Sequence, residues 1–169
     1  AFDSVHLNSL QRNLEAIYDL HTSERVEDFV LTDRVLAGQL LTNDRLSSAP
    51  ETLLVRQGRS SLAVSLFLDC EVLSRLRDDS PAEVLHDGNL GDFLTAVEGV
   101  SHFLYLTWNA RFERSVTQLE LELQAEVDKF VVLRALFGIS GEALVEAARK
   151  AAEEDDAPEY EELYRSMAK

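Results

Sequence analysis

A glutamate and a histidine four residues apart are the most promising pair for chemistry in this sequence. Glu98 and His102 lie in a region of strong helical periodicity, where this spacing brings two side chains together on one face. Tyr105 and Asn109 continue the same polar stripe at steps of three and four residues, and neither is a typical residue of a purely solvated helix face. We therefore predict that Glu98 contacts His102, with Tyr105 and Asn109 beside them.

Two further glutamates extend this candidate polar site from the next predicted helix. If the two helices fold back on each other, the carboxylates of Glu122 and Glu126 come near the stripe. Carboxylates and histidines on facing helices are the ligands of metal sites in helical bundles. Di-iron bundles, however, use Glu-x-x-His twice with two further glutamates, whereas this chain has Glu-x-x-x-His once. The pattern is more typical of an exposed polar stripe or a buried ion-pair network, and we predict neither a metal nor a cofactor.

These residues depend on a long helical stretch, 92–137, which contains no proline and a single glycine. As one helix it would extend ~69 Å, whereas a compact domain of this length has a radius of gyration of only about 15 Å. A break is therefore expected, and Thr117 with Glu120 forms a capping box at a suitable place. We predict a central antiparallel hairpin of two helices, 91–113 and 117–137.

Apolar residues on both helices define the predicted core. The helix over 117–137 is apolar on two nearly opposite faces, which is typical of a helix sandwiched between others. Gly99 would let another segment of chain or a ligand approach closely. A second capping box, Ser115 with Gln118, offers a competing start for the later helix. The residues expected to be among the most buried are Phe103, Leu104, Trp108, Leu123, Val127 and Phe130.

The N-terminal part of the chain is predicted to combine helices with one small β element. Amphipathic spacing predicts a helix over 4–20 and a shorter one over 24–31. The segment 32–50 gives a mixed signal of helix and loop residues. Two apolar runs on either side of a turn predict a β-hairpin at 52–68.

Three more helices are predicted around the central pair. Asp69 suits the N-cap of a helix that ends near Arg77. Pro81 suits the first turn of a short helix that ends near His86. After the central helices, apolar spacing predicts a further helix over 141–153.

The C-terminal segment is predicted to be an acidic linker, 153–157, followed by a short helix over 158–168. A helix so short is marginal alone in water and needs a surface on which to dock. Since tyrosine and methionine are favoured at interfaces, this helix either packs on its own domain or docks on a second copy or a partner. Its candidate docking face consists of Tyr160, Leu163, Tyr164 and Met167.

Length and composition indicate one globular domain, 1–169. The predicted helices and the β-hairpin together give a mostly α (α+β) fold. The formal net charge of −15 repels phosphate backbones and anionic lipids, so we expect neither nucleic acid nor membrane as a partner. Solubility alone is a sufficient explanation of that charge. The single cysteine, Cys70, fits a reducing compartment and is expected to be a small core residue. Because no apolar run is long enough to cross a membrane, the predicted location is the cytoplasm.

The sequence contains none of the common catalytic motifs that we sought, namely phosphate-binding or dinucleotide-binding glycine patterns, the zinc-protease helix, the nucleophile elbow or a cysteine pair. We therefore favour a non-catalytic protein-interaction or regulatory module that binds another protein or forms a homo-oligomer. A variant is an acidic chaperone or a mimic of nucleic acid. The alternative is a small-molecule-dependent or metal-dependent enzyme or binding protein with its polar site between the two central helices.

Overall fold

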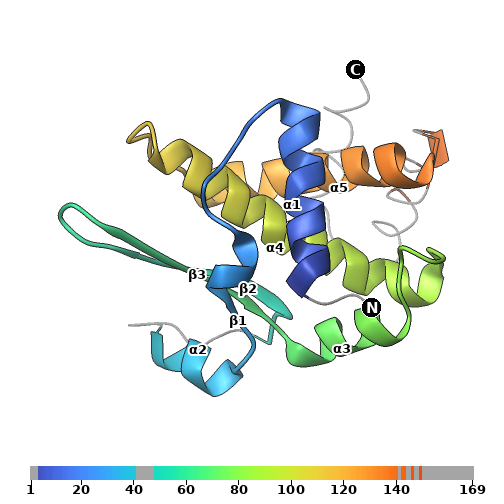
Figure 1. Cartoon of the computed structure of the whole chain (residues 1–169), viewed down its shortest axis with the longest axis horizontal. Coiled ribbons are helices and arrows are strands. Elements are labelled where there is room, and N and C mark those ends of the chain that lie inside the picture. Colours follow the sequence, from blue (N-terminus) through green and yellow to red (C-terminus); the bar gives the residue numbers. More distant parts are fainter. Residues whose placement is uncertain (1–3, 41–47, 141, 144–145, 147–148, 150–169) are drawn as a thin grey trace. The chain divides into compact units, whose positions relative to one another are not determined.

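The computed structural model describes residues 4–40, 48–140, 142, 143, 146 and 149, and for 4–6 the backbone alone. The chain forms two compact units, 1–129 and 130–169, which are described separately below. Helices dominate, together with a small three-stranded sheet, which confirms the predicted mostly α (α+β) fold class (Figure 1). The organisation as a single domain stays a prediction.

The first unit begins with α1 (Ser4–Tyr18), which confirms the predicted helix and ends slightly before its predicted end. Three leucines on one face, Leu7, Leu10 and Leu14, are buried. Asp19 follows with φ 51°, a left-handed backbone conformation that stops the helix.

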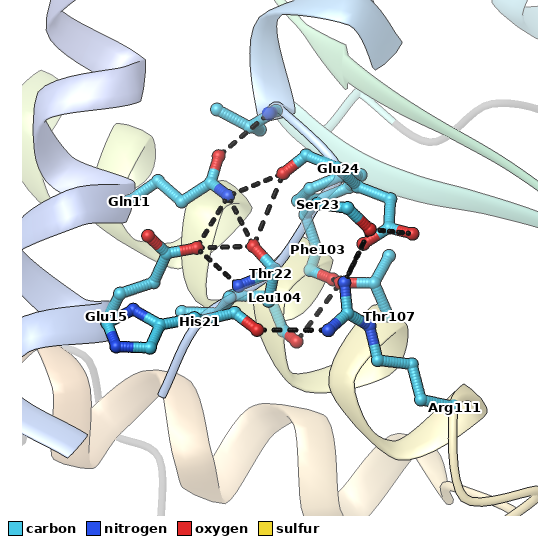
Figure 2. A network of polar contacts seen from close by, with 11 residues as sticks. Gln11, Glu15, His21, Thr22, Ser23, Glu24, Phe103, Leu104, Thr107 and Arg111 are labelled. Atoms are coloured by element: carbon cyan, nitrogen blue, oxygen red, sulfur yellow. Dashed lines mark hydrogen bonds and ion pairs between the residues drawn. The ribbon is translucent and has the colours of Figure 1, made fainter. Parts of the chain in front are cut away.

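A buried glutamine ties α1 to the loop that follows it. The Gln11 amide donates to the backbone carbonyl of Glu24 at 2.7 Å, and its oxygen accepts the N–H of Val26 at 2.8 Å. From the other side, Arg111 donates to the carbonyl of His21 at 3.0 Å and forms an ion pair with Glu24 at 2.6 Å (Figure 2). The loop is therefore held by α1 and by Arg111, a residue far from it in the sequence.

The predicted helix over 24–31 is wrong. The structure has a single 3-10 turn, η1 (Val26–Phe29), followed by the short strand β1 (Val30–Leu31). The bond from Gln11 holds the start of this segment, and the end of it pairs with another strand instead of continuing the turn. Long-range hydrogen bonds thus override the helical spacing of its apolar residues.

The sheet has three strands in the order β1-β3-β2. The strands β2 (Glu51–Gln57) and β3 (Leu62–Leu68) are antiparallel neighbours, which confirms the predicted β-hairpin at 52–68. β1 pairs in parallel with the other edge of β3.

The segment 32–50, for which the sequence signal is mixed, contains the helix α2 (Arg34–Leu40). Asp33 caps this helix, because its carboxylate accepts two N–H groups of the first turn. Residues 41–47 lie outside the described residues.

Two helices cover opposite faces of the sheet (Figure 1). Successive residues of a strand point to opposite faces. Phe67 accordingly packs with Ala37 of α2, whereas Leu66 approaches Gly99 of the long helix α4 (Asp87–Ala110). The sheet therefore positions its inner face directly against α4.

The helix α3 (Cys70–Asp78) follows β3 and is capped by Asp69, as predicted. Cys70 is exposed at its first turn, so its predicted place in the core is wrong. The reason is that Val72 and Leu76 lie on the buried face of the helix, and at this spacing Cys70 lies on the exposed face.

The short helix predicted from Pro81 to His86 is also wrong, since Pro81 opens only a turn. The side chain of Asn89 donates to the carbonyl of Val84 at 2.8 Å and holds this loop in place. His86 is instead the N-cap of α4, which starts earlier than predicted.

The long helical stretch is broken as predicted. α4 ends at Ala110, and α5 (Gln118–Phe137) starts after a loop in which Glu113 has φ 54°. The predicted capping box is present: the N–H of Glu120 donates to Thr117 Oγ1 at 3.2 Å, and the N–H of Thr117 donates to Glu120 Oε2 at 2.8 Å. Because α5 runs through both compact units, the antiparallel packing of the whole hairpin stays a prediction.

The burial predicted for Leu123 and Val127 of α5 is wrong. Within the first unit, α5 turns Ala125 and Asp128 inward, and its larger apolar side chains point elsewhere. Asp128 accepts a hydrogen bond from Ser101 of α4 at 2.6 Å, so a polar contact fixes which face is buried. Of the predicted core, the buried members are Phe103 and Leu104, the half-buried ones are Trp108 and Phe130, and the exposed ones are Leu123 and Val127.

The second unit begins inside α5, at Phe130. Gly138 has φ 64° and ends the helix, as a C-cap glycine does. Ser140 accepts the N–H of Ala143 at 3.2 Å, which is a capping bond for the predicted helix over 141–153. Residues 142, 143, 146 and 149 of that helix are helical.

Several predictions for the C-terminus fall outside the described residues. They are the other residues of 141–153, the linker 153–157, the helix over 158–168, and the docking face of Tyr160, Leu163, Tyr164 and Met167.

Candidate functional site

The candidate site forms where β2 crosses α4 at a glycine. A Cβ atom on Gly99 would lie 3.1 Å from Cγ of Glu51 and 3.2 Å from Cδ1 of Leu66. The missing side chain therefore allows the hairpin to lie close to the helix. This contact brings the Glu51 carboxylate next to the helix face that carries Glu98 and His102.

His102 lies at the centre of this group. Its side chain is buried, and its Nδ1 atom lies 3.3 Å from Oε1 of Glu51. Its other ring nitrogen, Nε2, has no hydrogen-bond partner among the described residues, and Oε2 of Glu122 lies 3.9 Å from it. One possible ligand atom from each of Glu51, Glu98 and His102 lies within 4.8 Å of the other two.

A lysine from α5 adds positive charge. Lys129 Nζ lies 2.5 Å from Oε2 of Glu98 and 2.7 Å from Oε1 of Glu126. All of these residues belong to the first unit, and we call them the polar cluster: Glu51, Glu98, His102, Glu122, Glu126 and Lys129.

The cluster favours the positively charged forms of its bases. Burial alone lowers the pKa of His102, but the hydrogen bond and charge of Glu51, together with the charges of Glu122 and Glu98, leave the net pKa raised. Burial likewise opposes the charged form of Lys129, yet the charges and hydrogen bonds of Glu98 and Glu126 together leave its pKa raised. Burial is also the main cause of the raised pKa of Glu51. The site is therefore an environment that attracts positive charge.

Tyr105 and Asn109 do not belong to the polar cluster. The Asn109 amide donates to the backbone carbonyl of Tyr105 at 2.8 Å, and both residues line a separate cavity of about 330 Å³. Asp128 lines the same cavity and accepts hydrogen bonds from Tyr18 at 2.5 Å and Ser101 at 2.6 Å. Burial, followed by the bond to Asp128, raises the pKa of Tyr18. The Asn109 amide and the Asp128 carboxylate are thus already paired within the protein.

The structure brings together four of the predicted site residues, Glu98, His102, Glu122 and Glu126, while Tyr105 and Asn109 lie on the neighbouring cavity. Whether the four act together as a functional site stays a prediction. Sequence reasoning does not find Glu51, because this residue lies at the start of a strand remote in sequence from the helices. The single relevant signal is Gly99 of α4, which predicts the close approach of another segment.

The outer end of the β2–β3 hairpin is a second notable feature. Residues 55–63 are exposed, and Figure 1 shows this end of the hairpin extending away from the helices of the first unit. It carries Arg56 and Arg59, and the sequence has no acidic residue over 52–68. In a chain with a net charge of −15, residues 55–63 are therefore a local basic projection, which we call the basic ribbon.

Comparisons with known proteins give no relative for this chain: no protein-family model, no curated protein and no solved structure matches it. No helix in the described part of the chain is long and apolar enough to cross a membrane. The features on which a function can rest are therefore the polar cluster and the basic ribbon.

Proposed function

We propose that this chain is a non-catalytic protein-interaction module that assembles with a second copy of itself through the basic ribbon. The observation that carries the proposal is the exposure of this ribbon, whose charge is opposite to that of the chain as a whole. The same proposal keeps the cytoplasm as the location and excludes nucleic acid as a partner, on the grounds of the single cysteine and the net charge.

The ribbon has apolar and backbone surface that a partner can cover. Val55 is 47% exposed and Leu62 is 39% exposed, although both lie in strands. β2 is the last strand of the sheet, so its outer edge has no neighbouring strand within the described residues. A two-stranded ribbon is marginally stable alone in water, and a free strand edge is a template for pairing with another chain. Binding of a partner therefore stabilises this part of the molecule.

Charge complementarity identifies the partner segment. The sequence over 153–162 has seven acidic residues and no basic one: Glu153, Glu154, Asp155, Asp156, Glu159, Glu161 and Glu162. Arg56 and Arg59 of one copy attract this segment of another, since complementary charges fix the register of an interface and favour its formation. The interface is reciprocal in a symmetric dimer, because each copy supplies one ribbon and one acidic segment.

Light scattering coupled to size-exclusion chromatography, over a series of protein concentrations, tests the proposal on the full chain. We expect wild type to dimerise and Arg56→Glu with Arg59→Glu to be monomeric. A matched control, Arg12→Glu with Arg25→Glu, changes the net charge equally at exposed positions outside the ribbon and should dimerise like wild type. A wild-type protein that is monomeric at every concentration would overturn the proposal, as would a control that dissociates as readily as the ribbon variant.

A charge swap makes the test specific for the acidic segment. Replacing residues 153–156 by lysine should also give a monomer, because the ribbon then faces like charge. An equimolar mixture of this variant with the ribbon variant should recover a dimer. In the mixed dimer the acidic ribbon of one variant faces the lysines of the other, and the basic ribbon faces an acidic segment. If each variant is monomeric and the mixture does not dimerise, the acidic segment is not the partner of the ribbon.

A further inference from the structure

A buried nitrogen in the polar cluster has no hydrogen bond. The His102 side chain is 6% exposed, and its Nε2 atom has no hydrogen-bond partner among the described residues. Buried polar atoms nearly always have a partner, so an exception needs a physical explanation, such as a bound ion. The imidazole nitrogen of histidine is also the commonest protein ligand of metals.

The opposite ring nitrogen of His102 is already held. Its Nδ1 atom lies 3.3 Å from the carboxylate of Glu51, a residue that is itself buried. Metal-binding histidines usually donate their second N–H to a carboxylate, which fixes the ring orientation and leaves the other nitrogen free for the metal. Glu51 reaches this position because Gly99 has no side chain. The contact therefore presents Nε2 as the free ligand atom.

Two more carboxylates lie near the imidazole of His102. Oε2 of Glu122 is 3.9 Å from Nε2. A carboxylate oxygen of Glu98 lies within 4.8 Å of a ring nitrogen of His102 and of an oxygen of Glu51. Ligand atoms around a zinc ion are about 2.0–2.2 Å from the metal and hence roughly 3–4 Å apart, so small side-chain rotations complete the set. The Glu122 side chain is 52% exposed, which gives it room to rotate and gives an ion a path from solvent.

The charges of the cluster favour a cation. Lys129 pairs with Glu98 and Glu126, whereas Glu122 has no lysine or arginine partner in the described part of the chain. The combination of imidazole and carboxylate suits zinc and similar transition-metal ions. Magnesium and calcium instead take oxygen ligands almost entirely.

We propose that His102 Nε2, Glu98 and Glu122 bind one zinc ion in the first unit, and that Glu51 holds the imidazole in position. Three protein ligands would leave a fourth tetrahedral position for water or a bound molecule. This site is independent of the proposed self-association, because the polar cluster lies at the start of β2 and the basic ribbon at its other end.

Titration calorimetry with zinc chloride and the full chain tests the site. We expect one zinc per chain for wild type and no specific binding for His102→Ala. Glu122→Gln should weaken binding strongly, and Glu51→Gln should weaken it by roughly 10–100-fold, as for other residues that orient a metal ligand. Magnesium chloride should give no comparable binding. Cobalt(II) in place of zinc should give visible absorption bands of a four-coordinate site, which disappear in His102→Ala.

Two controls separate this site from general attraction of cations. His21→Ala removes an exposed histidine and should bind zinc like wild type. Glu126→Gln makes the same charge change as Glu122→Gln on the same helix, but at a residue that pairs with Lys129, and should retain zinc. If circular dichroism shows that His102→Ala is unfolded, the test uses zinc binding by Glu122→Gln, because Glu122 is exposed. The proposal is overturned if folded wild type binds no zinc at a ratio of one per chain, or if the Glu122 and Glu126 variants lose zinc equally.

Discussion

Gln11 shows how one buried amide fixes the course of a loop without apolar packing. Its nitrogen donates to Glu24, to Thr22 Oγ1 at 2.9 Å and to Glu15 Oε1 at 3.1 Å, and its oxygen accepts the N–H of Val26. Buried backbone groups at the end of a loop need partners just as those of a helix do. A fully used amide supplies them from α1, which is why the chain turns toward the sheet at this point (Figure 2).

Replacing Gln11 by leucine should therefore lower the free energy of unfolding. Leucine has a similar size but leaves the buried N–H of Val26 without its partner, a loss of about 1–3 kcal/mol. Urea denaturation of both proteins measures this difference. Arg12→Ala, at the next and exposed position, should change stability by less than about 0.5 kcal/mol. A leucine variant as stable as wild type would show that water replaces the amide.

At the scale of elements, caps could be predicted from the sequence because they involve residues three positions apart or fewer. Asp69 caps α3, and Thr117 with Glu120 caps α5, as their local patterns indicate. The buried face of α5 could not be predicted, since Ser101 and Asp128 decide it across two helices. The same holds for Glu51, which joins the polar cluster only after the hairpin has packed on α4.

Asp69 both caps α3 and pairs with a residue of α2, and its contribution to the free energy of unfolding should depend on pH. Its carboxylate also pairs with Arg34 of α2 at 2.7 Å, and this hydrogen bond is the main cause that lowers its pKa below the ordinary value of 3.8. A lowered pKa in the folded state means that the contribution to stability is complete above the unfolded-state pKa and is lost as the pH falls through the folded-state value.

Asp69→Asn keeps an oxygen that can cap the helix but removes the charge. The stability difference between wild type and this variant should be constant above about pH 5 and should shrink as the pH falls below about 4. Urea denaturation across this range, which leaves the ion pair unscreened, measures it. A difference that stays the same at low pH would mean that Asp69 acts through its cap alone.

At the scale of the whole molecule, composition predicts the sign of the charge but not its distribution. The chain has 31 acidic and 16 basic residues, yet the outer end of its hairpin, residues 55–63, carries only basic charge and its C-terminal segment is strongly acidic. Net charge alone suggests repulsion between copies. The separation of the two signs along the chain instead permits attraction between complementary segments, which is the basis of the proposed assembly.

The C-terminal helix predicted over 158–168 provides a final test at this scale. Its apolar residues, Leu163 and Tyr164 among them, share one face of a helix too short to be stable alone in water. If this face docks on a second copy beside the basic ribbon, deletion of 157–169 should reduce the mass in solution while the remaining chain stays folded. Leu163→Asp with Tyr164→Asp should act in the same way without shortening the chain, because charged side chains disfavour an apolar interface. A lower midpoint with unchanged mass would instead mean that the segment packs on its own chain.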